Sequence, residues 1–387
     1  AMENYRERFV TGALASGVAP DIAQEIWRQM ESFAGYAFCK AHSASFALVS
    51  YQTAWLKAHY PAEFMAAVLS NQGGFYDTCA YVEEARRLGL TLLPPDVNES
   101  EYRFTSCADP VTLSLSKGGR VTHTHGVVRI GLMQVKHLSG SAIESILENR
   151  RNGPYTSLDN FLSRVTIDAN ETEMLIRCGA MDAFAKSRPQ LLWQLKLLMK
   201  SAVRIANSTC NGQRTFQEEH FYPAPLRQAQ GDNLESCVTR EYNSHEKLWA
   251  ELECLDLTVS EHLLALYGVE VAENGLTLSE TGLGACHNWP RSILPIIAAR
   301  DLSQHAGRLV TLVGWMVTAK RTRTGKRELM KFMTLEDPTA CFEVTLFPKI
   351  YRQFGALAYD RGPYIVRGRV ERDGQSCTLT ALWLNRV

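Results

Sequence analysis

Apolar residues recur every three or four positions over the first part of the chain, and this spacing predicts helices. Residues 3–14 and 21–33 are two such segments, and Gly17 and Pro20 between them end the first helix. The apolar stripe of the second segment consists of Ile22, Ile26, Met30 and Phe33. Because an apolar stripe on a helix normally faces a core, we expect these side chains to be buried.

Further helices are predicted over residues 43–58, 76–88 and 188–199, whereas the last eighty residues alternate with the period of two that is typical of strands. The predicted strands are residues 309–317, 329–335, 341–347, 364–370 and 377–384, with a short helix over 348–354. Three strands, a helix and two strands is the element order of the OB-fold. This five-stranded barrel binds single-stranded nucleic acid through its first loop and the face of its second and third strands.

Composition narrows the class of protein. The 387 residues are enough for about two to four domains. Lysine plus arginine and aspartate plus glutamate are equal at 41 each, but from residue 308 to the end there are 14 cations against 7 acids. This basic C-terminal part indicates a nucleic-acid partner. The ten cysteines form no C-x-x-C pair, which argues against a zinc ribbon or a disulfide framework and fits a cytoplasmic protein. No apolar run is long enough to span a membrane.

The predicted first loop of the barrel holds five cations in eight residues with no acid between them. These cations are Lys320, Arg321, Arg323, Lys326 and Arg327. We interpret the loop as a phosphate contact, with a solvated hairpin tip as the alternative. Phe332 and Phe342, on the next two strands, would either stack on bases or fill the inner face of the barrel.

Lys40 and His42 precede the helix predicted over residues 43–58. Residues 35–42 have the composition of a loop, and a loop here would deliver both side chains to the N-terminus of that helix. The backbone N–H groups and the dipole at a helix N-terminus favour an anion such as phosphate. The alternative is a pair of solvated loop residues.

The run FAGYAFCKAHSASFALVSYQTAWLKAHYPAEFMAAVL, residues 33–69, closely resembles the fingers of the bacterial DNA polymerase III alpha subunit, a C-family DNA polymerase. LGLTLLPPDVNESEYRF, residues 88–104, and LIRCGAMD, residues 175–182, continue the resemblance. Residues 245–267 resemble a connector of that family, and residues 313–337 resemble the entry to its OB domain. The resemblance implies that Lys40 and His42 face the incoming triphosphate. Cys39 stands where the family usually has asparagine.

Residues 129–147, RIGLMQVKHLSGSAIESIL, resemble the family's helix-hairpin-helix element, in which two helices present a K-G-V-G turn to DNA phosphates. We expect one helix to turn through residues 136–140 into a second helix opened by Ser141. His137 and Ser139 stand at the two glycine positions, and Gly140 comes one place late. The residues that would contact DNA are Arg129, Lys136, Ser139, Gly140 and Ser141. The alternative is a plain helical hairpin that packs on its neighbours.

Two segments, residues 107–124 and 222–233, depart from the family, and we interpret them as surface-loop insertions without function. His123 in the first segment and His125 directly after it offer only two ligands, so we predict no metal site. The family also docks on a sliding clamp through a short Gln-containing peptide. Residues 217–221 and 194–198 are the two candidates for it, so a sliding clamp or a mutasome protein is a candidate partner.

The predicted fold class is a multidomain α+β protein with mainly α-helical fingers and helix-hairpin-helix regions and a C-terminal five-stranded OB-fold β-barrel. The expected domains are the C-terminal part of the fingers (1–104), the helix-hairpin-helix region (105–200), a linker and connector (201–300) and the OB domain (301–387).

The resemblance implies DNA-templated polymerisation of dNTPs, in DNA replication or in error-prone lesion-bypass synthesis and repair. Its partners would be primer–template DNA, single-stranded DNA and dNTP. The family's two Mg²⁺ ions are held by palm aspartates that we expect upstream of Ala1, so this chain alone should hold no catalytic residue or metal and be inactive. The absence of a tau-binding domain after the barrel resembles the error-prone paralogue. The alternative function is a non-catalytic DNA-binding module derived from such a polymerase.

Overall fold

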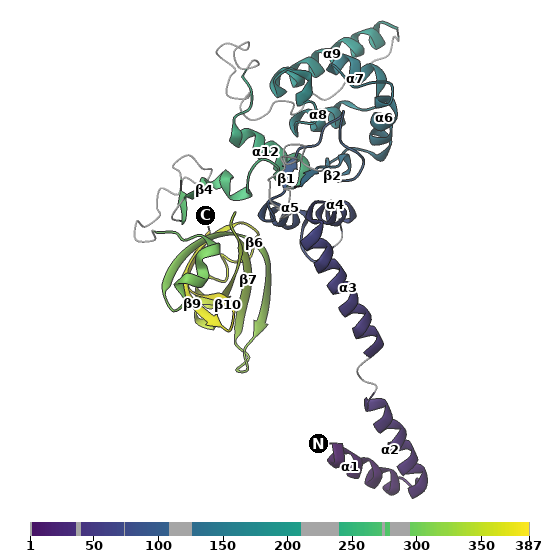
Figure 1. Cartoon of the computed structure of the whole chain (residues 1–387), viewed down its shortest axis with the longest axis vertical. Helices are drawn as coiled ribbons and strands as arrows, with labels where there is room; N and C mark the ends of the chain where they lie inside the picture. The colour runs from purple at the N-terminus through teal and green to yellow at the C-terminus, as the bar shows by residue number, and fades with distance from the viewer. Residues whose placement is uncertain are drawn as a thin grey trace, which may run out of the picture. The chain divides into compact units, whose positions relative to one another are not determined.

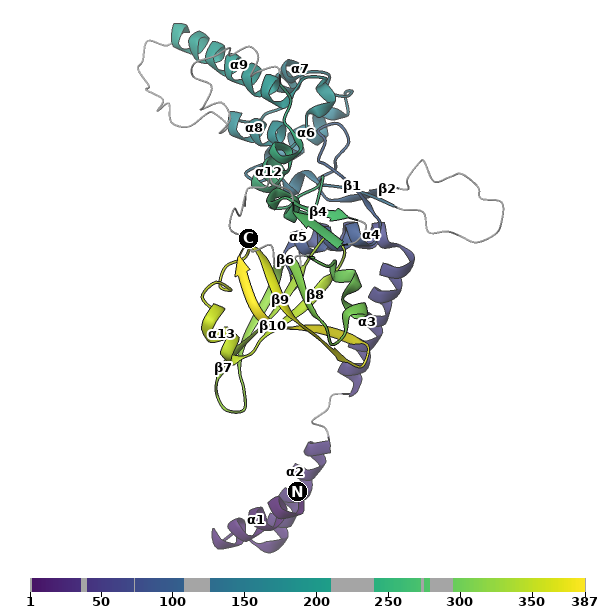
Figure 2. The same cartoon turned by 90° about the vertical axis from the view of Figure 1, so that its left-hand side faces the viewer.

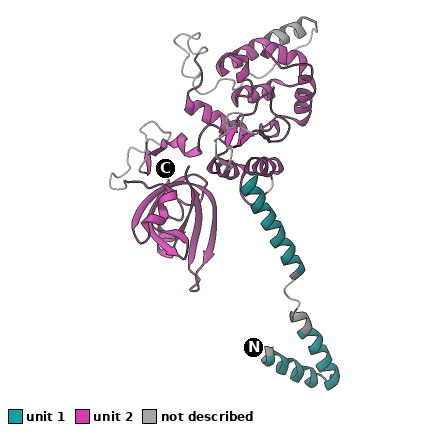
Figure 3. Ribbon diagram, in the orientation of Figure 1, with its two compact units in different colours: residues 1–60 teal, residues 61–387 magenta. Residues whose placement is uncertain are grey.

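The computed structural model describes residues 2–35, 40–72, 74–107, 126–209, 240–272, 275–278 and 295–386. The chain divides into two compact units, Ala1–Tyr60 and Pro61–Val387 (Figure 3). In the described part of the chain, no helix combines the length and the apolar character that a membrane crossing needs.

The first unit consists of helices α1 (Met2–Ala15), α2 (Pro20–Gly35) and α3 (Lys40–His59). Helices α1 and α2 pack through Phe9 and Trp27, whose ring centroids lie 5.6 Å apart. The expectation of a buried stripe on α2 is wrong for Ile22, Ile26 and Met30, which are exposed. Helix α1 instead covers the neighbouring face of α2, where Ala23 and Trp27 are buried.

The helical part of the second unit surrounds a small sheet (Figure 1). Strand β3 (Val127–Arg129) lies in its centre, parallel to β1 (Thr91–Leu93) and antiparallel to β2 (Thr105–Cys107). The helices are α4 (Pro61–Asn71), α5 (Thr78–Arg87), η2 (Leu132–Gln134), α6 (Gly140–Arg150), α7 (Leu158–Arg164), α8 (Ala169–Arg177), η3 (Asp182–Phe184), α9 (Arg188–Thr209) and α12 (Ser244–Leu255). One hydrophobic core runs through these elements, from Ala62 to Val259.

Local sequence explains where several of these helices begin. Asp168 and Glu171 form a reciprocal capping box at the start of α8, and Asn243 and Glu246 form another at the start of α12. Each box satisfies two backbone N–H groups that the first turn of a helix leaves unpaired.

The connector to the barrel contains η4 (Leu263–Tyr267), β4 (Val269–Ala272), β5 (Gly275–Leu278) and η6 (Ala299–His305). Leu264 of η4 shares a small hydrophobic cluster with Val313 and Ile365 of the barrel. The connector is therefore packed on the barrel rather than joined to it only by the chain.

The C-terminal barrel confirms the predicted fold class (Figure 2). Its strands are β6 (Leu309–Arg323), β7 (Leu329–Glu336), β8 (Cys341–Leu346), β9 (Pro363–Asp373) and β10 (Ser376–Arg386), with α13 (Pro348–Phe354) after β8. They close in the order β10-β8-β7-β6-β9. Apolar side chains of alternate residues, including Leu312, Leu335 and Val366, fill the barrel.

Candidate nucleic-acid interface

The basic segment of the barrel was predicted to be a loop, but it forms a β-hairpin in which only the turn is loop. Lys320, Arg321 and Arg323 lie in strand β6, which is six residues longer than the predicted strand ending at residue 317. The turn is closed by hydrogen bonds from the Thr324 N–H to the Glu328 carbonyl (2.9 Å) and from the Arg327 N–H to the Thr324 carbonyl (2.8 Å). Strand pairing therefore holds three of the five cations in defined directions.

All five cations of the hairpin are exposed. Within the described residues, none of them forms an ion pair, and the acid in the turn, Glu328, lies 3.6 Å from Arg352 of α13 instead. Exposed cations without a protein partner keep their charge available for phosphate groups.

The register of β6 and β7 divides these cations between two sides of the hairpin. Lys320 pairs with Phe332, whereas Arg321 pairs with Lys331 and Arg323 with Leu329. Directly paired residues in an antiparallel ladder point to the same side, and successive residues point to opposite sides. Phe332 is 43% exposed and has Lys320 beside it. An exposed ring next to a cation can take a base on the ring and a phosphate on the cation.

Phe342 does not belong to this surface, and its prediction as a base-stacking residue is wrong. Its side chain is 3% exposed and lies in the barrel core. A Cβ atom added at Gly314 would lie 2.8 Å from the Phe342 ring, so the glycine on β6 leaves the space that the ring fills. Of the two alternatives for this residue, the structure shows the core.

Lys40 and His42 lie in the first turn of α3 and not in a loop before it. The helix begins three residues earlier than the sequence predicted. His42 is exposed, and its ring packs edge-on against Phe46 at 4.6 Å. Cys39 lies outside the described residues. The role of Lys40 and His42 at a triphosphate stays a prediction.

The predicted helix-hairpin-helix has a shorter first element than expected. η2 is a single 3₁₀ turn, and α6 begins at Gly140 with Ser139 as its N-cap. The Ser139 hydroxyl accepts the Ala142 N–H at 3.2 Å. His137, at the first glycine position of the family's turn, has φ +60°, a left-handed conformation that glycine adopts without strain. His137 thus adopts this conformation although it carries a side chain.

The polar groups of this turn are largely engaged. Arg129 is paired with Glu99 and donates to the Pro94 carbonyl at 3.2 Å. The Lys136 ammonium lies 2.5 Å from Asp256. The Ser139 N–H donates to Glu171 at 2.8 Å. The N–H groups of Gly140 and Ser141 begin α6 and so have no acceptor within the helix.

Several other predictions concern residues that lie outside the described part of the chain or in α9. Residues 217–221, the two insertions apart from Cys107, and His123 and His125 lie outside the described residues. Residues 194–198 lie in α9, where Gln194 contacts Asp159 at 2.5 Å and Lys186 at 2.8 Å. A sliding-clamp peptide therefore stays a prediction. Among the residues that the structure describes, no three His, Cys, Asp or Glu side chains gather closely enough to hold a metal ion.

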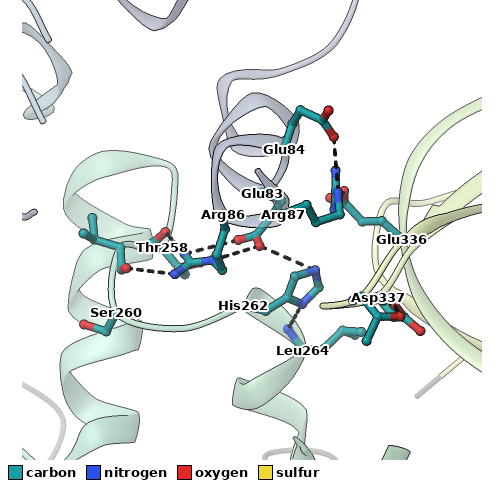
Figure 4. A network of polar contacts seen from close by, with 12 residues as sticks. Glu83, Glu84, Arg86, Arg87, Thr258, Ser260, His262, Leu264, Glu336 and Asp337 are labelled. Carbon is teal, nitrogen blue, oxygen red and sulfur yellow. Dashed lines mark hydrogen bonds and ion pairs between the residues drawn. The ribbon is translucent and has the colours of Figure 1, made fainter. Parts of the chain in front are cut away.

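A network of polar contacts links α5 to the connector and to the barrel, and the sequence did not predict it (Figure 4). Arg86 of α5 contacts Glu83 at 3.1 Å and donates to the Thr258 and Val259 carbonyls of the connector at 3.1 and 3.2 Å. The neighbouring Arg87 donates to Glu336 of β7 at 3.1 Å. The sequence signal was the EEARR motif, residues 83–87, but charges spaced this way usually mark a solvated helix face.

Two carboxyl groups and one imidazole in this network have shifted pKa values. Burial raises the pKa of Glu336 to about 7, although Arg87 opposes the shift. Burial also raises the pKa of Glu83. His262 is buried, and burial followed by repulsion from Arg86 and Arg87 lowers its pKa to about 3. Its Nδ1 accepts the Leu264 N–H at 3.1 Å, so the proton is assigned to Nε2, which faces Glu83 at 4.0 Å.

Comparison with known proteins agrees with this architecture. Residues 89–191 match the family described as a helix-hairpin-helix motif. The chain is 32% identical, over 96% of its length, to DNA polymerase III subunit alpha of Neisseria meningitidis serogroup A, of which it covers 29%. It is 30% identical, over 98% of its length, to the error-prone DNA polymerase of Symbiobacterium thermophilum, of which it covers 34%. A solved domain of replication protein A from Methanococcus maripaludis matches 24% of the chain at 17% identity, and its TM-score of 0.21 supports no inference.

The helix-hairpin-helix match and these relatives make the chain similar to DNA polymerases. More particularly, the chain is homologous along nearly its whole length to DNA polymerase III subunit alpha and to the error-prone DNA polymerase. It spans about three-tenths of the length of these relatives.

Proposed function

We propose that this chain is the C-terminal, DNA-holding part of a DNA polymerase III alpha subunit or an error-prone DNA polymerase, and that its barrel binds the single-stranded template. The observation that carries the proposal is the β6–β7 hairpin, whose cations are exposed and form no ion pair within the described residues. Phe332 beside Lys320 supports it, because stacking and phosphate contact together bind a single strand without reading its sequence.

The same proposal gives roles to the other predicted residues. Lys40 and His42 contact the triphosphate of the incoming dNTP at the start of α3. The N–H groups of Gly140 and Ser141 contact the backbone of the primer–template duplex, since a helix N-terminus favours a phosphate. Polymerisation and its Mg²⁺ ions belong to the whole polymerase, and the chain alone incorporates no nucleotide.

The test is the salt dependence with which the 387-residue chain binds a fluorescent oligothymidylate. Replacing Lys320, Lys326 and Arg327 with alanine should flatten the plot of log K against log salt by roughly 2, because each lost phosphate contact removes about 0.7. The matched control replaces Arg308, Arg369 and Arg372, three exposed arginines elsewhere on the barrel. Equal effects of the two triple variants would show that net charge, and not the hairpin, binds the strand.

The dNTP role needs the full-length polymerase. Lys40→Ala and His42→Ala should raise the KM for dNTP without weakening the binding of primer–template DNA. A KM equal to that of the wild type would refute the role. Incorporation by the 387-residue chain alone, measured by primer extension with Mg²⁺, would refute its predicted inactivity.

A further inference from the structure

A cavity of about 400 Å³ lies between the β6–β7 hairpin and α13. Its lining includes Arg323, Arg327 and Leu329 from the hairpin and Pro348, Tyr351 and Arg352 from α13. This volume is within the range of cavities that hold small molecules.

The cavity is on the side of the hairpin opposite to Phe332. Arg323 pairs with Leu329, and both line the cavity. Lys331 lies two residues from Leu329 on the same side, and its ammonium donates to the Ala358 carbonyl in the segment after α13. Lys320 and Phe332 each lie one residue along their strands from Arg321 and Lys331, so their side chains point to the opposite side of the hairpin.

The lining combines positive charge with an apolar wall. Three guanidinium groups border the cavity, and Glu328 is the one carboxylate among its lining residues. Glu328 lies 3.6 Å from Arg352, which leaves a surplus of two positive charges. Tyr351 is half-buried at the edge of the barrel core, and Leu329 and Pro348 extend its apolar surface. Burial and the neighbouring Arg321 lower the pKa of Lys331, in keeping with positive potential on this side.

Arginines favour phosphate because a guanidinium can donate two parallel hydrogen bonds to it. An aromatic ring with apolar neighbours favours the flat face of a base. A nucleotide carries both groups a few ångströms apart, whereas an inorganic anion would leave the tyrosine unused and an apolar ligand would leave the arginines unpaired.

We propose that this cavity binds one nucleotide of a single strand, with its phosphate on Arg323 and Arg327 and its base against Tyr351. The proposal rests on the proposed function of the barrel in single-strand binding and adds a second contact to it. A strand bound at both places passes over the hairpin, with Phe332 on one side and Tyr351 on the other.

Photo-cross-linking tests the placement without any substitution in the protein. The 387-residue chain is mixed with an oligothymidylate that carries 5-iodo-deoxyuridine, irradiated and digested, and the adducts are located by mass spectrometry. Adducts on both Tyr351 and Phe332 are expected. Adducts on Phe332 alone would overturn the cavity while leaving the proposed function intact. Protection of Tyr351 by free dTMP that leaves the Phe332 adduct in place would assign the cavity to a free nucleotide and overturn its assignment to the strand.

Affinity measurements test the chemistry. Tyr351→Ala should weaken oligothymidylate binding roughly 5- to 150-fold, the range that loss of one stacking contact gives, with the salt slope unchanged. Tyr351→Phe should bind like the wild type. Arg323→Ala should flatten the slope by roughly 0.7, against no change for Arg369→Ala. Each variant is first compared with the wild type in thermal unfolding.

Different results would refute the nucleotide site in the cavity and the binding of a single strand by the barrel. If the Tyr351 and arginine variants bind like the wild type but Lys320→Ala and Phe332→Ala bind more weakly, the cavity is not a nucleotide site and the outer side of the hairpin is. If all of these variants bind like the wild type, the barrel does not bind the strand, and the proposed function fails with the inference.

Discussion

The helical part of the second unit and the barrel hairpin use their cations in opposite ways. In the helical part, many lysines and arginines are held by acids of other elements. Examples are Lys136 with Asp256, Arg150 with Glu101, Arg177 with Glu253 and Arg188 with Asp182. On the hairpin, five cations are exposed, and none has an acidic partner within the described residues.

This difference separates charges that stabilise the fold from charges that are available to a ligand. Removing a largely buried cation that an acid holds costs stability, because its hydrogen bonds and its packing are lost. Removing an exposed, unpaired cation costs little stability but takes away a contact for a polyanion. Substitutions in the helical part should therefore affect unfolding, and substitutions on the hairpin should affect binding.

The largest expected effect is at Arg188. Its side chain is buried, contacts Asp182 through two hydrogen bonds of 2.8 and 3.0 Å, and donates to the Arg177 carbonyl at 3.0 Å. Arg188→Ala should lower the free energy of unfolding by about 3 kcal/mol in urea denaturation, because it removes three hydrogen bonds and the packing of a buried side chain. Arg323→Ala, the hairpin counterpart, should change it by less than about 0.5 kcal/mol. Similar losses of unfolding free energy in both variants would contradict the difference between the helical part and the hairpin.

The second effect concerns the pH dependence of stability through Glu336. Its pKa of about 7 in the folded protein lies above the ordinary value of 4.5, so the folded state binds more protons between these values and stability falls as pH rises through them. From pH 5 to pH 8, the wild type should lose on the order of 2–3 kcal/mol relative to Glu336→Gln.

His262 acts in the opposite direction to Glu336. Because its folded pKa of about 3 lies below 6.5, its contribution to stability rises with pH between these values. The acids and cations that face it, Glu83, Arg86 and Arg87, are present in both proteins, so the difference between wild type and Glu336→Gln isolates the carboxylate. Parallel stability curves for the two proteins would contradict the raised pKa.

A smaller effect is expected at His137, whose left-handed backbone is unfavourable for a residue with a side chain. His137→Gly should raise the free energy of unfolding by about 0.5–1 kcal/mol. Ser139→Gly, in the same turn but at φ −72° and with a capping hydroxyl, should lower it by a few tenths. Opposite signs in thermal unfolding would support the assigned turn, and a loss in both variants would contradict it.

The smallest effect is expected for Lys136 in single-strand binding. Because its ammonium is held by Asp256, Lys136→Ala should leave the salt slope of oligothymidylate binding unchanged within error. Lys326→Ala on the hairpin should flatten the slope by about 0.7. A slope that changes equally for both lysines would mean that ion pairing does not remove a cation from the interface.

The periodicities anticipated most elements because they reflect local rules. The alternation of apolar residues from Leu309 onward predicted the barrel strands, and the small helix at Pro348 has the same bounds in the structure. Where periodicity failed, packing decided the outcome. The stripe of Ile22, Ile26 and Met30 is as apolar as many core stripes, but α1 packs on the adjacent face of α2.

The candidate site was predictable in kind but not in geometry. Five cations without an acid between them indicated phosphate contact, and strand register then placed Lys320 with Phe332 and Arg323 with Leu329 on opposite sides. The burial of Phe342 could not be read from its own strand, because it depends on the space at Gly314 of the neighbouring strand. The same holds for Tyr351, which meets the hairpin arginines only when α13 folds beneath them.

By itself, the sequence determined the order of the elements, the basic character of the C-terminal part and the resemblance to a polymerase, since all three are properties of neighbouring residues. Tertiary structure alone decided which charges are paired. Glu83 and Arg86 look like a solvated pair in sequence, yet Glu83 is buried and Arg86 is partly buried against the carbonyls of the connector. The physical reason is desolvation: whether a charge is stabilising, silent or available for a ligand depends on the segments that exclude water from it, and these come from distant parts of the chain.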